Sequence, residues 1–418
     1  MGKHGTAVQC LAGGMTREMF TEHYFAHVHE FMATARAEEP VFLTRAVNGV
    51  PTWVVTRYDD VRALLTDDRL SKDSPRLVEL LTEKLIAAGR EPKLNNLFGK
   101  HMLNSDPPDH TRLRLLLAKD FTARRVALLR PFTEQLTENL LTALATADGP
   151  VDVVDGFSVA LPAMVISELL GVPPEDRHEF QAWTGALLSG DPVQYVPADQ
   201  AINAYMSNLI AQKSATPGDD LLSAMTRASE EGDRLSTDEV LAMALLLLVA
   251  GHETTANLIS SGIRRLLTTP GLAEQLLADP APVVEEMLRV DTPVMLGTSR
   301  FTTVDVEVGG VTIPAGEIVA LSVGSANHDE ERFADSAEFD LDRGARGHIA
   351  FGHGLHHCLG APLARLEAEV ALTAFARQFP QARLAVPVEQ LPHRHAAIMN
   401  GHSEMPVVLG ARAVVTNS

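Results

Sequence analysis

The stretch that decides the fold is a loop of glycines and histidines that closes on a cysteine, and it reads AFGHGLHHCLG at residues 350–360. Its glycines permit backbone dihedral angles, or a close approach of the backbone, that other residues do not. Cys358 stands at the start of a predicted helix, where free N–H groups and the helix dipole favour a thiolate. His356, two residues earlier, can add a positive charge or donate a hydrogen bond. The loop is therefore predicted to present Cys358 as an anionic ligand for a soft metal.

Other interpretations of this loop have to be weighed against a metal ligand. A single cysteine, taken alone, is more often a buried structural residue than a ligand. A zinc site built from His356, His357 and Cys358 is disfavoured, because adjacent residues rarely bind one tetrahedral ion and no second cysteine pair follows. The segment at residues 352–354 is not a dinucleotide fingerprint, since its third glycine and the preceding strand are missing. The rest of the chain has to decide between a structural cysteine and a ligand.

The strongest helix in the sequence lies well before this loop. Ser236 and Glu239 have the spacing of a capping box, and helical residues run from Thr237 to Leu267. A helix of that length spans about 46 Å at 1.5 Å per residue. Its first half is apolar on nearly all sides, so we expect it to cross the centre of the molecule.

The segment AGHETT at residues 250–255 interrupts the apolar pattern of this helix. Ala250 and Gly251 are small and would leave room over a flat cofactor, and Thr254 lies one helical turn further on the same face. A hydroxyl in an apolar groove can hold dioxygen or water, and the neighbouring Glu253 can relay protons. The alternative is an ordinary threonine whose hydroxyl bonds back to its own helix, with Glu253 in a solvated gap.

The remaining pattern predicts a mostly helical chain with a minor β part, in one domain over 1–418 with a loose tail at 1–16. A further helix is expected directly after Cys358, with Pro362 in its first turn and its end before Pro380. Other helices are predicted over 20–37, 57–68, 77–88, 110–148, 158–215 and from about Pro282 to Pro293. Strands are predicted at Val41–Thr44 and Thr52–Thr56 around an Asn48-Gly49 turn, over 301–323, and in the tail from residue 381.

Composition limits the partners and the compartment. The 418 residues carry a net charge of −19, from 54 acidic and 35 basic side chains, which disfavours nucleic acid and anionic membrane as partners. Cys10 and Cys358 are the only cysteines, a usage that fits the reducing cytoplasm and makes a disulfide unexpected. The N-terminus has no apolar core of a signal peptide. The longest apolar run, Val240–Gly251, is too short to span a bilayer.

The cysteine loop matches the pattern F-G-x-G-x-H-x-C-x-G at every fixed position. On this motif the chain resembles the bacterial, soluble cytochrome P-450 family, of the kind found in actinobacterial secondary metabolism, and further motifs extend the resemblance over nearly the whole length. The resemblance implies the cytochrome P-450 fold, with a long helix across haem b and Cys358 as the axial ligand of the iron. It implies that Thr254 steers protons to iron-bound oxygen and that Glu253 helps to deliver them from solvent.

The same resemblance assigns residues to the cofactor and to a structural clamp. Cofactor contacts are implied for His110 and Arg114, spaced i, i+4, and for Ala250, Gly251, Arg300, Phe351, Gly352, His356 and Gly360. His110, Arg114, Arg300 and His356 would face the haem propionates, which need cations or strong donors. Glu286 and Arg289 have the family's E-x-x-R spacing and would pair with Arg343 in a buried clamp, although such a pair on a surface contributes little.

The implied reaction inserts one atom of dioxygen into a C–H or C=C bond of a lipophilic small molecule, such as a polyketide, macrolide or terpenoid. Electrons would come from a ferredoxin and its reductase, since the chain has no flavin or iron–sulfur motif, and a monomer is expected. A docking face is predicted at Arg112, Arg346, His353 and Arg365. The pocket is predicted at Leu246, Val294, Leu296 and Met399, among apolar stretches at 75–100, 170–200, 246–254, 294–296 and 398–400. Oxidative coupling, desaturation, peroxide-driven oxidation and a non-enzymatic haem sensor are the alternatives.

Overall fold

A long central helix organises the molecule. The computed structural model describes residues 17–92, 101–188, 192–228, 235–396 and 398–413, so Cys10 and the rest of the tail at 1–16 lie outside the described residues. Helix α12 runs unbroken over Thr237–Thr268, and Ser236 and Glu239 form both hydrogen bonds of the predicted capping box. The helix predicted over Thr237–Leu267 is confirmed, and it keeps its helical conformation through residues 250–255, where only the apolar pattern is interrupted.

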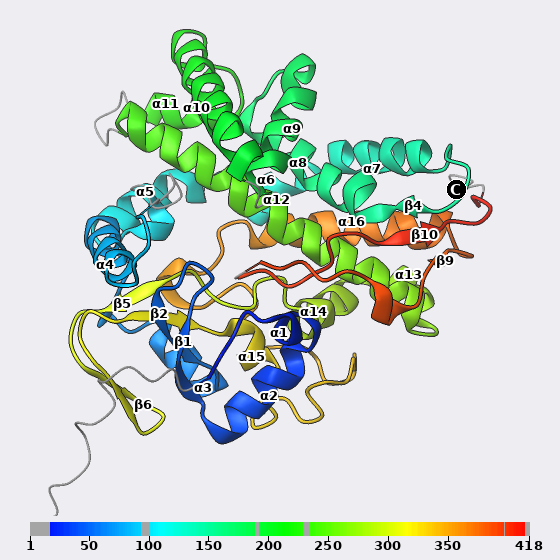
Figure 1. The fold of residues 1–418 in the computed structure, drawn as a ribbon. Helices are drawn as coiled ribbons and strands as arrows, with labels where there is room; N and C mark the ends of the chain where they lie inside the picture. The colour runs from blue at the N-terminus through cyan, green and yellow to red at the C-terminus, as the bar shows by residue number, and fades with distance from the viewer. Residues whose placement is uncertain (1–16, 93–100, 189–191, 229–234, 397, 414–418) are drawn as a thin grey trace, which may run out of the picture.

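Helices on both sides bury this central helix, which crosses the middle of the molecule in Figure 1. On one side α12 packs on α8 (Ala160–Leu170), whose residues are mostly buried. On another it packs on α16 (Ala361–Gln378), which starts just after Cys358, with Pro362 in its first turn as predicted. A Cβ on Gly262 would lie 2.7 Å from Leu372 Cδ1, so a glycine is needed where α12 crosses α16.

Further helices complete the mostly helical architecture. Those before α12 are α1 (Glu22–Ala26), α2 (Val28–Glu38), α3 (Tyr58–Leu64), α4 (Ser74–Ala87), α5 (Asp109–Ala118), α6 (Ala123–Ala127), α7 (Arg130–Leu144), α9 (Arg177–Leu188), α10 (Pro192–Ala215) and α11 (Leu221–Ala228). Those after it are α13 (Leu272–Ala278), α14 (Pro280–Val290) and α15 (Val323–Asn327). Short turns of other helix types are η2 (Met102–Asn104), η3 (Val154–Val159), η4 (Pro174–Asp176), η5 (Gly354–His356) and η6 (Val388–Gln390).

The minor β part forms three small sheets among the described residues. The largest has the strand order β1-β2-β8-β5-β3, with β2 and β8 parallel and the other neighbours antiparallel. Its strands are β1 (Val41–Arg45), β2 (Pro51–Val55), β3 (Leu70–Ser71), β5 (Arg300–Thr302) and β8 (Ile318–Leu321). The others pair β4 (Val151–Asp152), β10 (Pro406–Val408) and β9 (Arg383–Leu384), and β6 (Val306–Val308) with β7 (Val311–Ile313).

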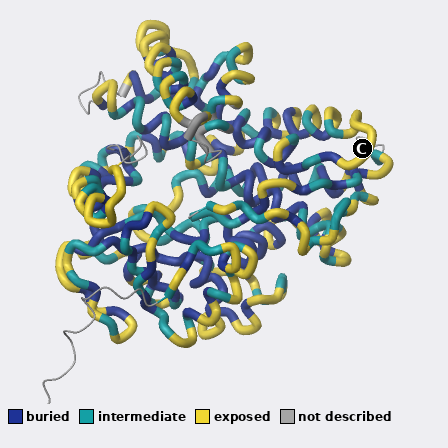
Figure 2. Tube along the Cα trace, in the orientation of Figure 1, coloured by how far each residue is buried: buried dark blue, intermediate teal, exposed yellow. Residues whose placement is uncertain are grey.

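The core lies where α12 meets its neighbours, and the exposed residues lie on outer helices and loop tips (Figure 2). By length and composition α12 could cross a membrane, but most of its apolar stretch is buried inside the protein. That burial is the ordinary reason for such a helix in a protein core.

The predicted fold class is confirmed, and the differences from it are local. The hairpin around Asn48-Gly49 forms as predicted, with Gly49 at φ 88°. Helix α14 begins at Pro280 rather than near Pro282, because Pro280 itself takes a first-turn position. Helix α13 and the short α15 were not predicted, since both are too short to show a clear apolar period.

Candidate functional site

The cysteine loop depends on two glycines in left-handed conformations. Gly352 and Gly354 both have φ 74°, which other residues rarely adopt. A Cβ on Gly354 would lie 2.6 Å from Thr66 Cγ2, so the loop also passes close to the end of α3. The Cys358 amide donates to the Phe351 carbonyl over 2.8 Å, which closes the loop. Gly360 then begins α16, and a Cβ on it would be only 3.9 Å from Cys358 Sγ.

The Cys358 thiol is surrounded by protein and yet has an exposed surface, so it faces an interior hollow. Burial raises the pKa of this thiol, whereas amides of Gly360 and Ala361 and the charges of Arg114 and Arg365 act against the rise. The amides at the start of α16 do lower the pKa of Cys358, as the sequence predicted. Burial raises it by more, so the net shift is upward. A bound metal deprotonates such a thiol directly, so a ligand role does not need a thiol that ionises by itself.

The face of α12 that was expected to border the cofactor is open in part. Ala250 is exposed although it lies in the middle of a mostly buried helix, and Thr254 is partly exposed. The Thr254 hydroxyl donates to the Ala250 carbonyl over 2.7 Å, which is the local bond that a threonine in any helix can form. Gly251 differs from the expectation, because a Cβ on it would be in ordinary contact with Ile166 of α8, at 3.5 Å. Gly251 thus faces α8, and the available space does not require a glycine there.

Glu253 forms an ion pair with Arg394, a residue near the C-terminus that the sequence analysis did not connect with it. Its Oε1 lies 2.5 Å from Nη1 of Arg394, and the two side chains are 13% and 24% exposed. The preceding residue, His252, is buried and its Nε2 lies 3.1 Å from the Val159 carbonyl. Burial is the largest cause that lowers the pKa of His252 to about 4, so its ring is neutral.

The four side chains expected at the propionates gather on one side of the cysteine loop. The rings of His110 and His356 are 4.4 Å apart, and Arg114 Nη2 donates to the His357 carbonyl over 2.7 Å. Arg300 is 6% exposed and, within the described part of the chain, forms no ion pair; burial lowers its pKa to about 10.

His356 is not a cation in this setting. Burial, with Lys72 and Arg300 next in importance, lowers the pKa of His356 to about 2. Its neutral ring can still donate one hydrogen bond, which corrects the expectation of a positive charge.

Lys72 belongs to the same group and was missed by the sequence analysis. It is 1% exposed, its Nζ bonds to Thr298 Oγ1, and burial lowers its pKa well below the usual range. It directly follows β3, which pairs with β5 so that Lys72 and Arg300 emerge together. An alternation of Leu70, Ser71 and Lys72 before a helix carries no signal of a buried lysine, so only the fold reveals it.

This group is short of negative charge, and that property fits haem. Lys72, Arg300 and Arg114 all lie close enough to His356 to lower its pKa, and the Asp106 carboxylate acts on Lys72 and Arg300. The Asp106 oxygens accept from Ser71 Oγ at 2.5 Å and from the Lys72 amide at 3.1 Å. Within the described part of the chain, neither ring nitrogen of the buried His110 forms a hydrogen bond of good geometry, and the Leu355 backbone is a nearby partner. A flat cofactor with two carboxylates would supply the missing charge, and Cys358 would supply a thiolate. Among the described residues no cluster of three His, Cys, Asp or Glu could hold another metal, which leaves the zinc interpretation unsupported.

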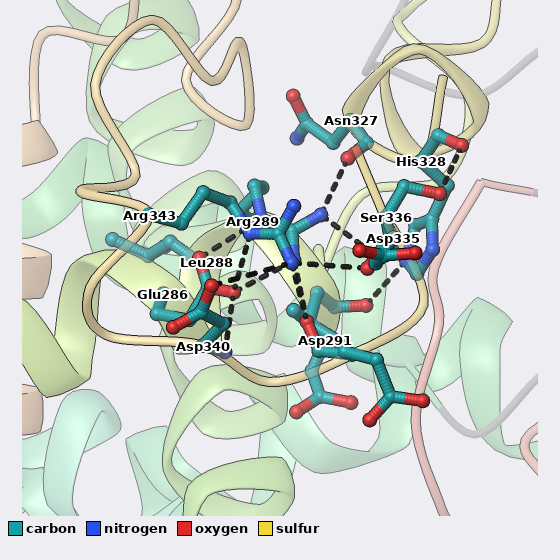
Figure 3. Close-up of polar contacts among 12 residues, drawn as sticks. Glu286, Leu288, Arg289, Asp291, Asn327, His328, Asp335, Ser336, Asp340 and Arg343 are labelled. Atoms are coloured by element: carbon teal, nitrogen blue, oxygen red, sulfur yellow. Dashed lines mark hydrogen bonds and ion pairs between the residues drawn. The ribbon is translucent and has the colours of Figure 1, made fainter. Parts of the chain in front are cut away.

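The predicted clamp residues come together in the interior (Figure 3). Arg289 and Glu286 are fully buried and joined by two hydrogen bonds, of 2.7 and 2.9 Å. Arg289 also donates to the carbonyls of Asn327 and Ser336, at 2.9 and 2.8 Å. Arg343 Nε lies 3.6 Å from Glu286 Oε1. The clamp therefore joins α14 to the end of α15 and to the chain that leads into the cysteine loop.

Glu285, the residue before the clamp glutamate, has partners of its own. Its carboxylate lies 2.5 Å from Arg365 Nε on α16 and 3.1 Å from His348 Nε2. The Arg365 guanidinium also stacks over Phe351, 4.5 Å from the ring centre. Burial alone would raise the pKa of Glu285, but the hydrogen bonds from His348 and Arg365 hold it at about 2.

Asp291, directly after α14, joins this helix to the central one. It binds Arg264 and Arg265 of α12 at 2.7 and 2.5 Å.

Of the four pocket residues, the structure brings two together. Val294 and Met399 form an antiparallel bridge and are both partly exposed. Leu246 and Leu296 are 5% and 3% exposed and belong to separate core clusters, so they pack in the core. The predicted pocket stretches include residues 93–100 and 189–191, which lie outside the described residues.

Comparison with known proteins places this fold and site in one class, the haem-thiolate enzymes. The family model described as cytochrome P450 matches residues 19–279 and 281–397. Cytochrome P450 107B1 of Saccharopolyspora erythraea is 47% identical, over 90% of this chain and 93% of its own length. The vitamin D(3) 25-hydroxylase of Pseudonocardia autotrophica is 42% identical, over 96% of this chain and 98% of its own. The solved P450 monooxygenase TamI, bound to tirandamycin C, superposes with a TM-score of 0.86 at 40% identity, over 94% of this chain and 100% of its own.

The chain belongs to the cytochrome P450 family. It is a monooxygenase, an oxidoreductase that uses haem b and acts on a lipophilic small molecule, as the sequence predicted. Bacterial members of this type receive electrons from redox partners.

Proposed function

We propose that this monooxygenase hydroxylates or epoxidises a polyketide, macrolide or terpenoid-like molecule, with electrons from a ferredoxin and its reductase. The observation that carries the proposal is the joint presence of an exposed Cys358 and a group of three cations, Lys72, Arg114 and Arg300, beside the single carboxylate of Asp106 among the described residues. The partly exposed, apolar Val294 and Met399 support a lipophilic substrate.

In this proposal the chain's own residues hold the cofactor and exclude competing reactions. Cys358 binds the iron, Phe351, Gly352 and Gly360 shape the loop around the sulfur, and Ala250 leaves space beside α12. His110, Arg114, Arg300, His356 and Lys72 hold the propionates. Glu286, Arg289 and Arg343 keep the cysteine loop in place and have no direct part in the reaction. Haem with a thiolate ligand supplies the activation of dioxygen.

Thr254 and Glu253 manage protons in this proposal. The Thr254 hydroxyl, already donating to Ala250, keeps two acceptor positions toward the open side of α12, where it can position water. Glu253 is partly exposed, so it can exchange protons with solvent and pass them inward. An adjacent acid and alcohol favour oxygen activation by electrons over peroxide use or a haem sensor.

The test of the cofactor assignment is the carbon monoxide difference spectrum of the reduced protein. We expect the thiolate-type spectrum for the unmodified chain and its loss in Cys358→Ala, with Cys358→Ser as the variant closest in size. Purified protein without porphyrin, or with an unchanged spectrum in Cys358→Ala, would contradict the assignment.

The test of the reaction class compares two ways of driving the enzyme. Product analysis of a lipophilic substrate panel with ferredoxin and reductase is compared with the same panel driven by hydrogen peroxide. Products that gain one oxygen atom only with ferredoxin support the proposal. Coupled or desaturated products, or better yields with peroxide, favour the alternative reactions.

The docking face needs revision before it is tested. Arg112 is held by Glu239 and Arg365 by Glu285, so reversal of either charge would also break an internal ion pair. Arg346 is exposed and His353 partly exposed, and these two positions are the better probes of ferredoxin binding.

We further propose that the chain works as one domain, as a monomer and in the cytoplasm. The family match over residues 19–279 and 281–397 supports the single domain, and the low cysteine count fits the cytoplasm. Sedimentation of the haem-loaded protein tests the monomer.

A further inference from the structure

The partner of Glu253 comes from a hairpin near the C-terminus. We define the C-terminal hairpin as residues 392–396 and 398–403. Its two sides are joined by an antiparallel bridge between His393 and His402 and by the Arg394 amide, which donates to the Gly401 carbonyl over 2.9 Å. The Ser403 amide donates to the Pro392 carbonyl over 3.0 Å. Arg394 therefore stands at the base of a hydrogen-bonded hairpin.

This hairpin touches α12 at two points one helical turn apart. The first is the ion pair between Arg394 Nη1 and Glu253 Oε1, at 2.5 Å. The second is Gly401, where a Cβ would lie 2.3 Å from Asn257 Oδ1, so its backbone packs directly on the helix. A charged pair that is this well shielded contributes more than one on an open surface.

The far end of the same hairpin borders the proposed pocket. Met399 forms a bridge with Val294, and the Ile398 carbonyl accepts from the Met295 amide over 2.8 Å. The Asn400 amide donates to the Pro293 carbonyl over 2.8 Å. A single short segment thus connects the pocket wall to the acid on α12.

We propose that Arg394 is a positioning residue that ties Glu253 to the C-terminal hairpin and releases it when the pocket wall at Met399 moves. While the pair is closed, the Glu253 carboxylate points at the hairpin and cannot carry protons inward. A ligand that displaces Met399 and the opening of the pair are then coupled, and the coupling acts in both directions. This inference rests on the proposed proton role of Glu253, but its mechanical part is independent of that role.

Hydrogen exchange of the haem-loaded protein without substrate tests the mechanical part. Arg394→Gln and Glu253→Gln should each speed exchange at the Arg394, Asn400 and Ser403 amides about tenfold, because each removes the same anchor. The double variant should be no faster than either single variant, and Arg394→Lys should keep most of the protection. As a matched control, Arg412→Gln breaks another arginine–glutamate pair, with Glu138, and should leave the hairpin unchanged. Unchanged exchange in the single variants, or additive effects in the double one, would overturn the anchor.

The proton part is tested by the fraction of consumed electrons that appears as hydrogen peroxide during ferredoxin-driven turnover. Arg394→Gln should raise this fraction about threefold when Glu253 is present, because a Glu253 that is never held back delivers protons before the pocket wall has moved, and should have no effect beside Glu253→Gln. A peroxide fraction that responds to Glu253→Gln but not to Arg394→Gln would overturn this inference alone. If Glu253→Gln leaves the peroxide fraction unchanged, the proposed proton role of Glu253 is itself wrong.

Discussion

At the scale of single residues, the site is a set of polar groups that are costly to bury in isolation. Lys72 and Arg300 are almost fully buried, and burial lowers the pKa of both. His356 is held neutral chiefly by burial, and Lys72 and Arg300 lower its pKa further. Each of these costs falls when an anion joins the group, so the residues that destabilise the protein alone are those that retain the cofactor.

Lys72→Met separates these two effects. Methionine has a similar volume and no charge, so the protein without haem should become about 1–2 kcal/mol more stable to unfolding, because a desolvated amine is gone. Haem should leave the variant about tenfold faster, because one propionate partner is lost. Transfer of haem to apomyoglobin and denaturant unfolding of the haem-free chain measure the two quantities. Lys84→Met, which removes a lysine bound to Glu317 away from the site, is the control and should not change haem release.

The motif predicted some of these residues and could not predict others. Cys358, His110, Arg114 and Arg300 stand in patterns whose spacing is visible in the sequence. Lys72 and Arg394 do not, since their partners lie more than a hundred residues away and only the fold brings them together. Sequence spacing also could not reveal that Gly251 faces Ile166, because a one-residue shift on a helix turns a side chain by about 100°.

At the scale of elements, two neighbouring glutamates on α14 bind different partners. Glu286 is used inside α14 to hold Arg289, whereas Glu285 reaches outward to Arg365 of α16 and to His348. The second contact fixes α14 to the helix that carries the cysteine loop. The helices themselves were predictable from caps and apolar periods, but the side on which each acid finds its partner was not.

The Glu285 contact makes stability depend on pH in a defined window. The carboxylate has a pKa of about 2 in the folded protein against 4.5 for the free group, so its contribution is fully present above pH 4.5 and is lost as pH falls toward 2. Glu285→Gln should therefore reduce the free energy of unfolding by about 1–2 kcal/mol at pH 7, with allowance for solvent screening. The difference from the unmodified protein should shrink as pH drops through this window. Urea unfolding at a series of pH values measures it, and a difference that is constant with pH would contradict the assignment.

Arg289→Met tests the clamp at the same scale. The change leaves the fully buried Glu286 carboxylate without its main partner and frees three backbone carbonyls. Loss of a buried partner costs on the order of 3–5 kcal/mol. We expect soluble yield and haem content to fall together, and the double change Glu286→Leu with Arg289→Met to recover part of the stability. If the double variant recovers neither soluble yield nor haem content, then the bonds from Arg289 to backbone carbonyls, and not its ion pair with Glu286, are what stabilises this region.

At the scale of the whole molecule, charge governs how a partner approaches. The chain carries a net charge of −19, so an acidic ferredoxin is repelled except where basic groups are exposed. Arg346→Glu should slow ferredoxin-dependent reduction about tenfold at low ionic strength and much less at high salt, while haem content stays unchanged. Stopped-flow reduction across a salt series measures this effect. The control is Arg383→Glu, which reverses an exposed charge in β9, a strand distant in sequence from Arg346. An equally slow reduction in this variant would mean that total charge matters and position does not.

Helix α12 is fastened at both of its ends. Near its start Glu239 pairs with Arg112 of α5, and near its end Arg264 and Arg265 bind Asp291. A helix held at both ends resists sliding along its own axis, so the position of Thr254 is restrained. Arg265, which Asp291 holds, lies about 16 Å along α12 from Thr254 at 1.5 Å per residue, so Asp291 would influence the alignment of the Thr254 face without touching a substrate. A substitution at Asp291 would therefore change the product pattern by shifting α12, while the residues that line the pocket stay the same.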